Sequence, residues 1–211
     1  MDKNIEGMSE QEAFKWYMEA AAKNDPEGQF CVGWCYFMGQ GVSEDNAEAF
    51  KWFAKSAAQN YGAAAHMMGI CYESGFGVEE DIKKAASWFG QAARLGNPSA
   101  QYRMGKCYAD GLGVEQDDVK AFQCFYEAAT NGSVQGLTEV GICLATGKGV
   151  DKDPENAFQC FKKASEPQNY PGALLNLAQC YEIGFGTKKN LREAKRLKDL
   201  ANMVAEALAN N

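Results

Sequence analysis

The sequence predicts an all-α fold, a solenoid of paired helices that repeats about every 36 residues. Three observations predict it. Glycines recur at a constant interval, at Gly33, Gly69, Gly105 and Gly141. A Gly-x-Gly pair follows each of these glycines, and an alanine-rich amphipathic stretch follows each pair. Self-similarity at a fixed interval of this length is the signature of stacked helical repeats.

Several other residue types keep the same register. A cysteine stands two positions after each recurring glycine, a valine follows each Gly-x-Gly pair, and an aspartate and an alanine come next. The copies are Cys35, Cys71, Cys107 and Cys143; Val42, Val78, Val114 and Val150; Asp45, Asp81, Asp117 and Asp153; and Ala49, Ala85, Ala121 and Ala157. We conclude that one structural unit is copied along the chain.

Each unit is predicted to hold two helices joined by a glycine turn. In one unit the first helix has apolar residues at the i, i+4, i+7, i+8 spacing of a helical packing stripe, namely Ala64, Met68, Cys71 and Tyr72. The Gly-x-Gly pair permits left-handed backbone angles just past the helix end. The aspartate after it is suited to cap the second helix, and Asp153 is followed by Pro154, which suits the first helical position.

The two ends of the array carry helix starts of their own. Residues 9–12 and 190–193 have the spacing of a capping box or a close variant of it. We therefore expect a single repeat domain over residues 1–211. Its predicted parts are an N-terminal half repeat over 9–23 and repeats over 24–60, 61–96, 97–132, 133–169 and 170–208, the last with a longer capping helix from about 190. Pro167 should end its helix early.

The composition limits the class of protein and of partner. The chain has 46% hydrophobic and 23% charged residues, as globular proteins do. No segment approaches the apolar run of a membrane span, and the first eight residues do not resemble a signal peptide. We therefore expect a cytoplasmic protein. The formal net charge of -7 argues against nucleic acid as a partner, and we interpret the locally basic residues 188–198 as a solvated helix face.

The repeated string Ala-x-x-x-apolar-Gly-x-x-Tyr-x-x-Gly-x-Gly-Val-x-x-Asp-x-x-x-Ala resembles the SEL-one-like repeat, a relative of the tetratricopeptide repeat. The resemblance covers nearly the whole chain and is most specific in the units that start near Gly28, Gly62 and Ser99. It implies a right-handed α-α superhelix, and it implies a scaffold that brings protein partners together, often in bacteria.

Later units depart from this pattern. Cys124 and Cys160 stand where Trp52 and Trp88 mark the aromatic position of the second helix. The last unit differs most, with Ala178, Thr187, Asn190 and Leu197 in place of the repeated Gly, Val, Asp and aromatic residues. Terminal repeats are often atypical because they cap the array.

The eight cysteines are predicted to be reduced thiols in the core. Five of them are one repeat position copied along the array, and Cys124 and Cys160 are another such pair. Neighbouring helix axes lie ~8–10 Å apart, whereas a disulfide needs Cα atoms within about 7 Å, so equivalent cysteines cannot readily pair. The sequence has no C-x-x-C motif and a single histidine, so we expect no zinc site.

Nothing in the sequence specifies a reaction or a cofactor. His66 is the one imidazole, and no nucleophile motif accompanies it. The Gly-x-Gly pairs do not continue into a phosphate-binding loop. We therefore predict a protein that is not an enzyme and that has no cofactor.

Superhelical repeats bind partners on a concave face, so the first-helix residues that point away from the packing stripe are candidate binding residues. The tetratricopeptide pattern gives three inward positions in each repeat. In order along the chain, they are Phe30, His66, Tyr102, Thr138 and Leu175; Trp34, Ile70, Lys106, Ile142 and Gln179; and Phe37, Glu73, Ala109, Ala145 and Glu182.

The first of these repeats holds an aromatic stripe, since Phe30, Trp34 and Phe37 follow the i, i+4, i+7 spacing. Exposed aromatic patches usually mark interfaces. The predicted partner-binding residues are Phe30, Trp34, Phe37, His66, Ile70, Tyr102 and Lys106. In the alternative interpretation the N-terminal half repeat, with Phe14, Trp16 and Tyr17, covers this stripe as ordinary core.

The sequence therefore favours an interaction scaffold that holds a peptide or protein segment in a concave groove. One alternative is a hydrolase, or a carbohydrate- or peptidoglycan-binding protein, that uses the same groove. Another is a chain that associates with itself through the ends of the solenoid.

Overall fold

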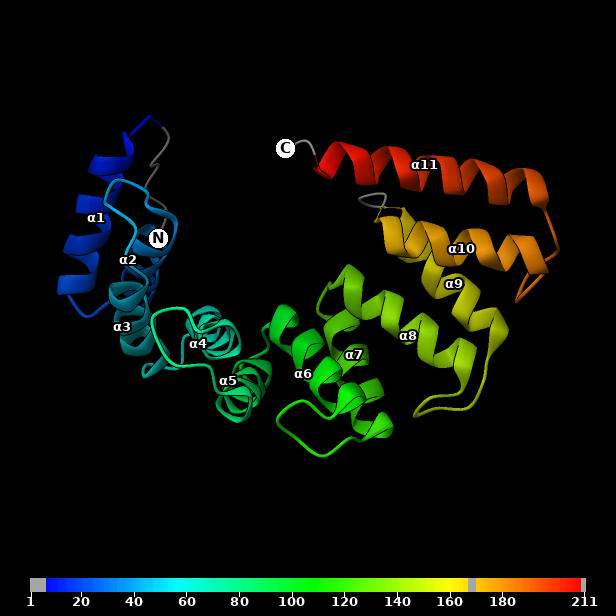
Figure 1. Cartoon of the computed structure of the whole chain (residues 1–211), viewed down its shortest axis with the longest axis horizontal. Coiled ribbons are helices and arrows are strands. Elements are labelled where there is room, and N and C mark those ends of the chain that lie inside the picture. Colours follow the sequence, from blue (N-terminus) through cyan, green and yellow to red (C-terminus); the bar gives the residue numbers. More distant parts are fainter. Residues whose placement is uncertain (1–6, 167–169, 210–211) are drawn as a thin grey trace. The chain divides into compact units, whose positions relative to one another are not determined.

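The computed structural model describes residues 7–166 and 170–209, and its regular elements in these ranges are all α-helices (Figure 1). The helices in the described part of the chain are α1 (Glu10–Ala22), α2 (Pro26–Met38), α3 (Asn46–Ala57), α4 (Gly62–Ser74), α5 (Ile82–Arg94), α6 (Pro98–Asp110), α7 (Asp118–Thr130), α8 (Val134–Thr146), α9 (Pro154–Ser165), α10 (Pro171–Ile183) and α11 (Leu191–Ala209). The predicted all-α repeat fold is confirmed. The predicted effect of Pro167 and the leading residues 1–6 lie outside the described ranges.

The helices form two compact units. The first holds the chain up to Ala100 together with Leu112–Val114, and the second holds Gln101–Gly111 and the chain from Glu115 onward. Within the first unit α1 to α5 pack in sequence order, each on the next. Within the second unit α7 to α11 do the same. Even-numbered helices are the first helices of the repeats, and odd-numbered helices are the second.

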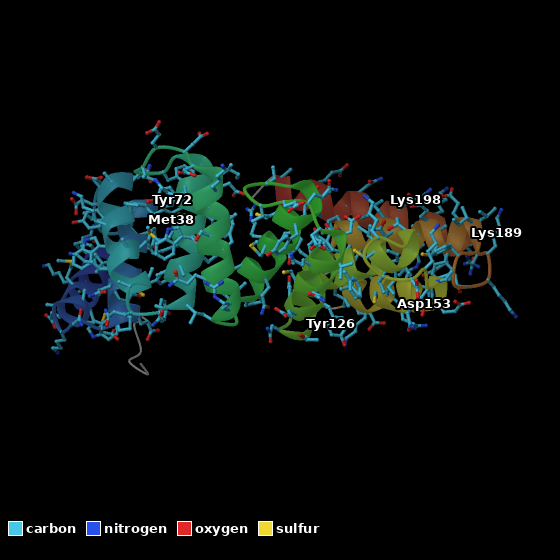
Figure 2. The ribbon with its side chains drawn as sticks, turned by 90° about the horizontal axis from the view of Figure 1, so that it is seen from below. Met38, Tyr72, Tyr126, Asp153, Lys189 and Lys198 are labelled. Carbon is cyan, nitrogen blue, oxygen red and sulfur yellow. The ribbon has the colours of Figure 1, made fainter. Side chains whose placement is uncertain are left out.

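The predicted helix starts are confirmed at the level of hydrogen bonds. Asp81 caps α5 by accepting hydrogen bonds from the backbone N–H groups of Lys83 and Lys84 at 3.1 and 3.0 Å. Asp153, labelled in Figure 2, caps α9 by accepting a hydrogen bond from the backbone N–H of Asn156 at 3.0 Å. At the N-terminal end of the array, Ser9 and Glu12 form a complete capping box, and at the start of α11 Asn190 Oδ1 accepts a hydrogen bond from the backbone N–H of Glu193 at 3.1 Å. These bonds satisfy amide groups that have no partner within the helix.

The Gly-x-Gly turn has two separate roles. The first glycine ends the helix: Gly39, with φ 68°, donates its N–H to the carbonyl of Cys35. The second glycine lies where two neighbouring repeats pack closely together. A Cβ on Gly41 would collide with the carbonyl of Glu10 at the start of α1. The copies of Gly41 meet the first turn of the preceding second helix likewise, at Gly77, Gly113, Gly149 and Gly186. Glycine is therefore required at both positions, for conformation and for space.

A ring on the second helix packs against a glycine on the first helix of the same repeat. Phe53 of α3 is fully buried, and a Cβ on Gly33 would lie 2.7 Å from its Cδ1 atom. The same pairing recurs at Phe89 with Gly69, Phe125 with Gly105 and Phe161 with Gly141. The main buried ring of the second helix is thus one residue past Trp52, which is only half-buried.

The predicted core position is confirmed for five of the eight cysteines. The five at the repeated position, Cys35, Cys71, Cys107, Cys143 and Cys180, are buried, whereas Cys31, Cys124 and Cys160 are half-buried, and no disulfide joins any of the eight. Burial raises the pKa of Cys71 to about 11. The thiols therefore behave as small, neutral, apolar side chains.

Candidate functional site

Three aromatic side chains of α2 form a continuous surface in the first unit, and we call Phe30, Trp34 and Phe37 the α2 aromatic cluster. The rings of Phe30 and Trp34 are stacked with centroids 6.3 Å apart, and those of Trp34 and Phe37 lie 5.8 Å apart. Phe30 and Phe37 are half-buried, whereas Trp34 is 37% exposed. The cluster therefore has a packed base and an exposed centre.

The base of the cluster is the core of the first unit. The rings of Phe30 and Phe37 lie 5.7 and 6.4 Å from the ring of the buried Phe53. The ring centroids of Phe30 and Tyr61 lie 5.5 Å apart. The rings of Phe37 and Phe76 pack edge to face, with their centroids 5.4 Å apart. These contacts hold the two phenylalanines in place, so they position Trp34 between them.

A cavity of about 270 Å³ opens beside this cluster. Its lining comes from α1, from α2 and from the turn after α2, and consists of Tyr17, Phe30, Cys31, Trp34, Cys35 and Gln40. Burial, with a smaller contribution from the nearby charge of Glu27, raises the pKa of Cys31 to about 11. The pKa of Tyr17 is also raised, first by burial. Both groups are neutral at physiological pH, so the cavity wall is apolar and aromatic.

The N-terminal half repeat only borders the cluster. Phe14 packs edge-on against Tyr36, with ring centroids 5.6 Å apart, on the packing side of α2. Trp16 lies 5.4 Å from Tyr17. Tyr17 is the residue of α1 in the cavity lining, and Trp34 keeps its exposure beside it.

Two further predicted residues, His66 and Ile70, lie on α4 in the same unit. Ile70 packs, together with Phe30 and Phe37, against the core cluster of that unit. The ring of His66 is half-buried and lies 5.8 Å from the ring of Phe89. The structure thus joins Ile70 to the base of the α2 aromatic cluster and directs His66 toward α5.

The remaining predicted residues, Tyr102 and Lys106, belong to the second unit. The ring of Tyr102 lies 6.0 Å from Phe125, and burial raises the pKa of its hydroxyl. Lys106 Nζ forms an ion pair with Asp110 at 3.3 Å. Burial acts to lower the pKa of Lys106, but the bond to Asp110 and the charge of Glu139 outweigh it, and the pKa is raised. Lys106 is therefore a cation held by neighbouring carboxylates.

A second cavity, in the second unit, was not predicted as a site. It has a volume of about 260 Å³ and lies between α8 and α10, over α9. Its lining is Ile142, Ala145, Thr146, Phe161, Asn176, Gln179, Cys180, Ile183 and Phe185. Ile142, Ala145 and Gln179 are among the predicted inward positions, so the repeat register contained a signal for it.

Within 7–166 and 170–209, no three His, Cys, Asp or Glu side chains come together as a metal site would require. None of the helices in the described ranges is both long and apolar enough to cross a bilayer.

Comparisons with known proteins agree with the geometry of the repeats. The family model of the Sel1 repeat matches residues 7–25, 26–61, 62–97, 98–133, 134–166 and 171–197. These matches together span most of the chain. A search of the curated proteins found no match.

Solved structures give the same result. The chain is similar to a Sel1 repeat protein from Oxalobacter formigenes, with a TM-score of 0.87 and 27% identity over 92% of this chain and 77% of that one. It is similar to c5321, a protective antigen of uropathogenic Escherichia coli with an SLR fold, with a TM-score of 0.83 and 28% identity. That alignment covers 92% of this chain but 41% of the antigen.

A third structure, the immunity protein Pa5087 from Pseudomonas aeruginosa, shares the fold alone. Its TM-score is 0.52 at 23% identity, over 90% of this chain and 65% of that one. The repeated glycine turns, the capped second helices and the family model lead to one conclusion: the chain belongs to the Sel1 repeat family.

Proposed function

We propose that this chain is a non-catalytic interaction scaffold that binds a peptide or protein segment at the α2 aromatic cluster. The observation that carries the proposal is Trp34, a tryptophan that is 37% exposed at the mouth of a 270 Å³ apolar cavity. Tryptophan and tyrosine are the residues most enriched among interface anchors. An exposed tryptophan beside an open apolar cavity favours a partner that buries both.

The packing around the cluster supports this proposal. Because Phe30 and Phe37 are already fixed against the core ring of Phe53, a partner would not have to order them on binding. A preorganised surface loses less conformational entropy on association. The tryptophan therefore offers a binding surface at low entropic cost.

The charges at the edge of the cavity indicate the chemistry of the partner. Burial is the largest cause of the raised pKa of Cys35, and the charge of Glu10 adds to it. The charge of Glu27 adds in the same way to the effect of burial on the pKa of Cys31. Both acids therefore lie near the apolar lining. A segment with an apolar side chain for the cavity and basic residues next to it would match this arrangement.

Affinity capture tests the proposal, with the wild-type protein and two variants immobilised in parallel. Trp34→Ala removes the proposed anchor. Tyr126→Ala is the matched control, because Tyr126 of α7 is 55% exposed and lies outside the site; its side chain is labelled in Figure 2. We expect partners that bind wild type and Tyr126→Ala but are lost from Trp34→Ala. If all three proteins capture the same partners equally, the proposal is wrong.

A further inference from the structure

The cavity of the second unit has a filled counterpart in the first unit, and the repeat register identifies it. Ala145 of α8 stands 108 residues after Phe37 of α2, and Phe161 stands 108 residues after Phe53. Phe185 is the copy of Phe76, with one residue added to the interval by the insertion near Pro167. Ala145, Phe161 and Phe185 all line the cavity.

In the first unit this space is occupied by a side chain of the chain itself. The ring of Phe37 lies 6.4 Å from the ring of Phe53 and 5.4 Å from the ring of Phe76. In the second unit the two flanking rings are kept as Phe161 and Phe185, but Ala145 replaces the phenylalanine between them. The cavity is therefore the space of one missing aromatic ring.

Its size and walls suit such a ring. An apolar cavity of about 150 Å³ in another protein binds benzene, so 260 Å³ accommodates a phenyl group and the start of its main chain. Phe161 and Cys180 at the floor are 3% exposed, whereas Thr146, Gln179 and Ile183 at the mouth are exposed. The amide groups of Asn176 and Gln179 stand where they could hydrogen-bond a peptide backbone.

We infer that this cavity, the ring pocket, binds the phenylalanine side chain of a bound polypeptide in the place that Phe37 occupies in the first unit. That the ring comes from a polypeptide rests on the proposed function. The existence of the pocket follows from the packing of α8, α9 and α10 and does not depend on the proposed function.

The test uses the full chain with isoleucine methyl groups labelled with ¹³C, and follows the methyl signals of Ile142 and Ile183 by NMR. The probes are the capped peptides Gly-Gly-Phe-Gly-Gly and its copies with Leu or Ala at the centre. We expect saturable shifts with the Phe peptide, binding about tenfold weaker with Leu, and no shift with Ala, because the pocket discriminates apolar side chains by shape.

Two variants locate the binding. Ala145→Phe fills the pocket with the ring of the first unit, so it should abolish the shifts and raise the melting temperature. Ala145→Leu fills the pocket partly and replaces Ala145→Phe in this test if the Phe variant does not fold. Ala109→Phe, at the same repeat position on α6, is the matched control and should keep the shifts.

Two results would overturn the inference. The first is the absence of saturable shifts with the Phe peptide; if free toluene shifts the signals in that case, the pocket is a small-molecule site. The second is persistence of the shifts in a folded Ala145 variant. If the ring pocket fails while Trp34→Ala still loses the captured partner, the proposed function stands without it.

Discussion

Tyr17 of α1 and Phe53 of α3 occupy the same position of consecutive repeats, yet Phe53 is fully buried and Tyr17 is only half-buried. Gly33 of α2 lies over the ring of Phe53 and completes its burial. Tyr17 instead lines the cavity beside Trp34. One ring position thus serves the core in the full repeats and the candidate site in the half repeat.

The two rings should differ sharply in their effect on stability. Phe53→Ala should reduce the free energy of unfolding by ~3–5 kcal/mol, as loss of a buried phenylalanine does. Tyr17→Ala should cost less than half as much, because its ring is partly solvated before the substitution. Urea unfolding followed by circular dichroism measures both values. Equal losses would show that Tyr17 is a core residue like Phe53.

The glycine that packs against each buried phenylalanine ring should not tolerate a side chain. Gly69→Ala places a Cβ against the ring of Phe89 and should destabilise the protein by ~1–3 kcal/mol, as overpacking does. Gly62→Ala in the same helix is the control, since its nearest neighbour would be the Cβ of Leu95 at an ordinary 3.4 Å. We expect it to change stability by less than about 0.5 kcal/mol. Thermal unfolding of the pair distinguishes them, and similar melting temperatures would contradict the packing described.

Buried thiols should react slowly in the native protein. Burial raises the pKa of Cys71 and Cys143 from 9.0 to about 11, and the thiolate is the reactive form. We expect eight thiols to titrate with a disulfide reagent in denaturant at pH 8, and few of them to react at that pH without it. The native rate should rise as the pH approaches 11. Fewer than seven thiols in denaturant would contradict the free-cysteine description.

The raised thiol pKa values also set the direction of the alkaline stability change. Between the ordinary thiol pKa of 9.0 and about 11, the folded protein holds protons that the unfolded chain has lost. The free energy of unfolding should therefore fall as the pH rises through this window. Cys71→Ala should make the decrease in the free energy of unfolding with pH less steep. A slope unchanged by the substitution would contradict the raised thiol pKa as the cause of the decrease.

Removal of one whole period should leave a folded protein. Deletion of residues 78–113 joins Gly77 to Val114, which restores the Gly-Val step of the other turns. Because each repeat contacts mainly its neighbours, the shortened array should keep its helical content and a cooperative transition. A shortened protein without a cooperative thermal transition would show that the repeats are not interchangeable.

The sequence predicted the features that depend on residues close together in the chain. The aspartate caps, the glycine turns and the stripe of Ala64, Met68 and Cys71 are local patterns, and the structure has each of them. The ring that fills the core was harder to assign. Trp52 suggested the aromatic position, whereas the buried residue is Phe53, because the glycine that accepts the ring lies on another helix.

The cavities could not be predicted from one repeat at a time. The pocket between α8 and α10 exists because Ala145 is small where Phe37 is large, while Phe161 and Phe185 keep the flanking rings. That arrangement depends on side-chain volumes on three helices at once. The register placed Ile142, Ala145 and Gln179 on one face, but no periodicity reports an empty volume.

The most direct test of the account compares Trp34 with Tyr72, an aromatic residue of the packing stripe whose ring lies 5.6 Å from that of Phe50. Calorimetry measures the affinity of each variant for a captured partner, and thermal unfolding measures its stability. Trp34→Ala should weaken binding by ~2 kcal/mol or more with little change in melting temperature. Tyr72→Ala should lower the melting temperature. If Trp34→Ala unfolds the protein as severely as Tyr72→Ala, or leaves the affinity unchanged, the α2 aromatic cluster is core and the account is contradicted.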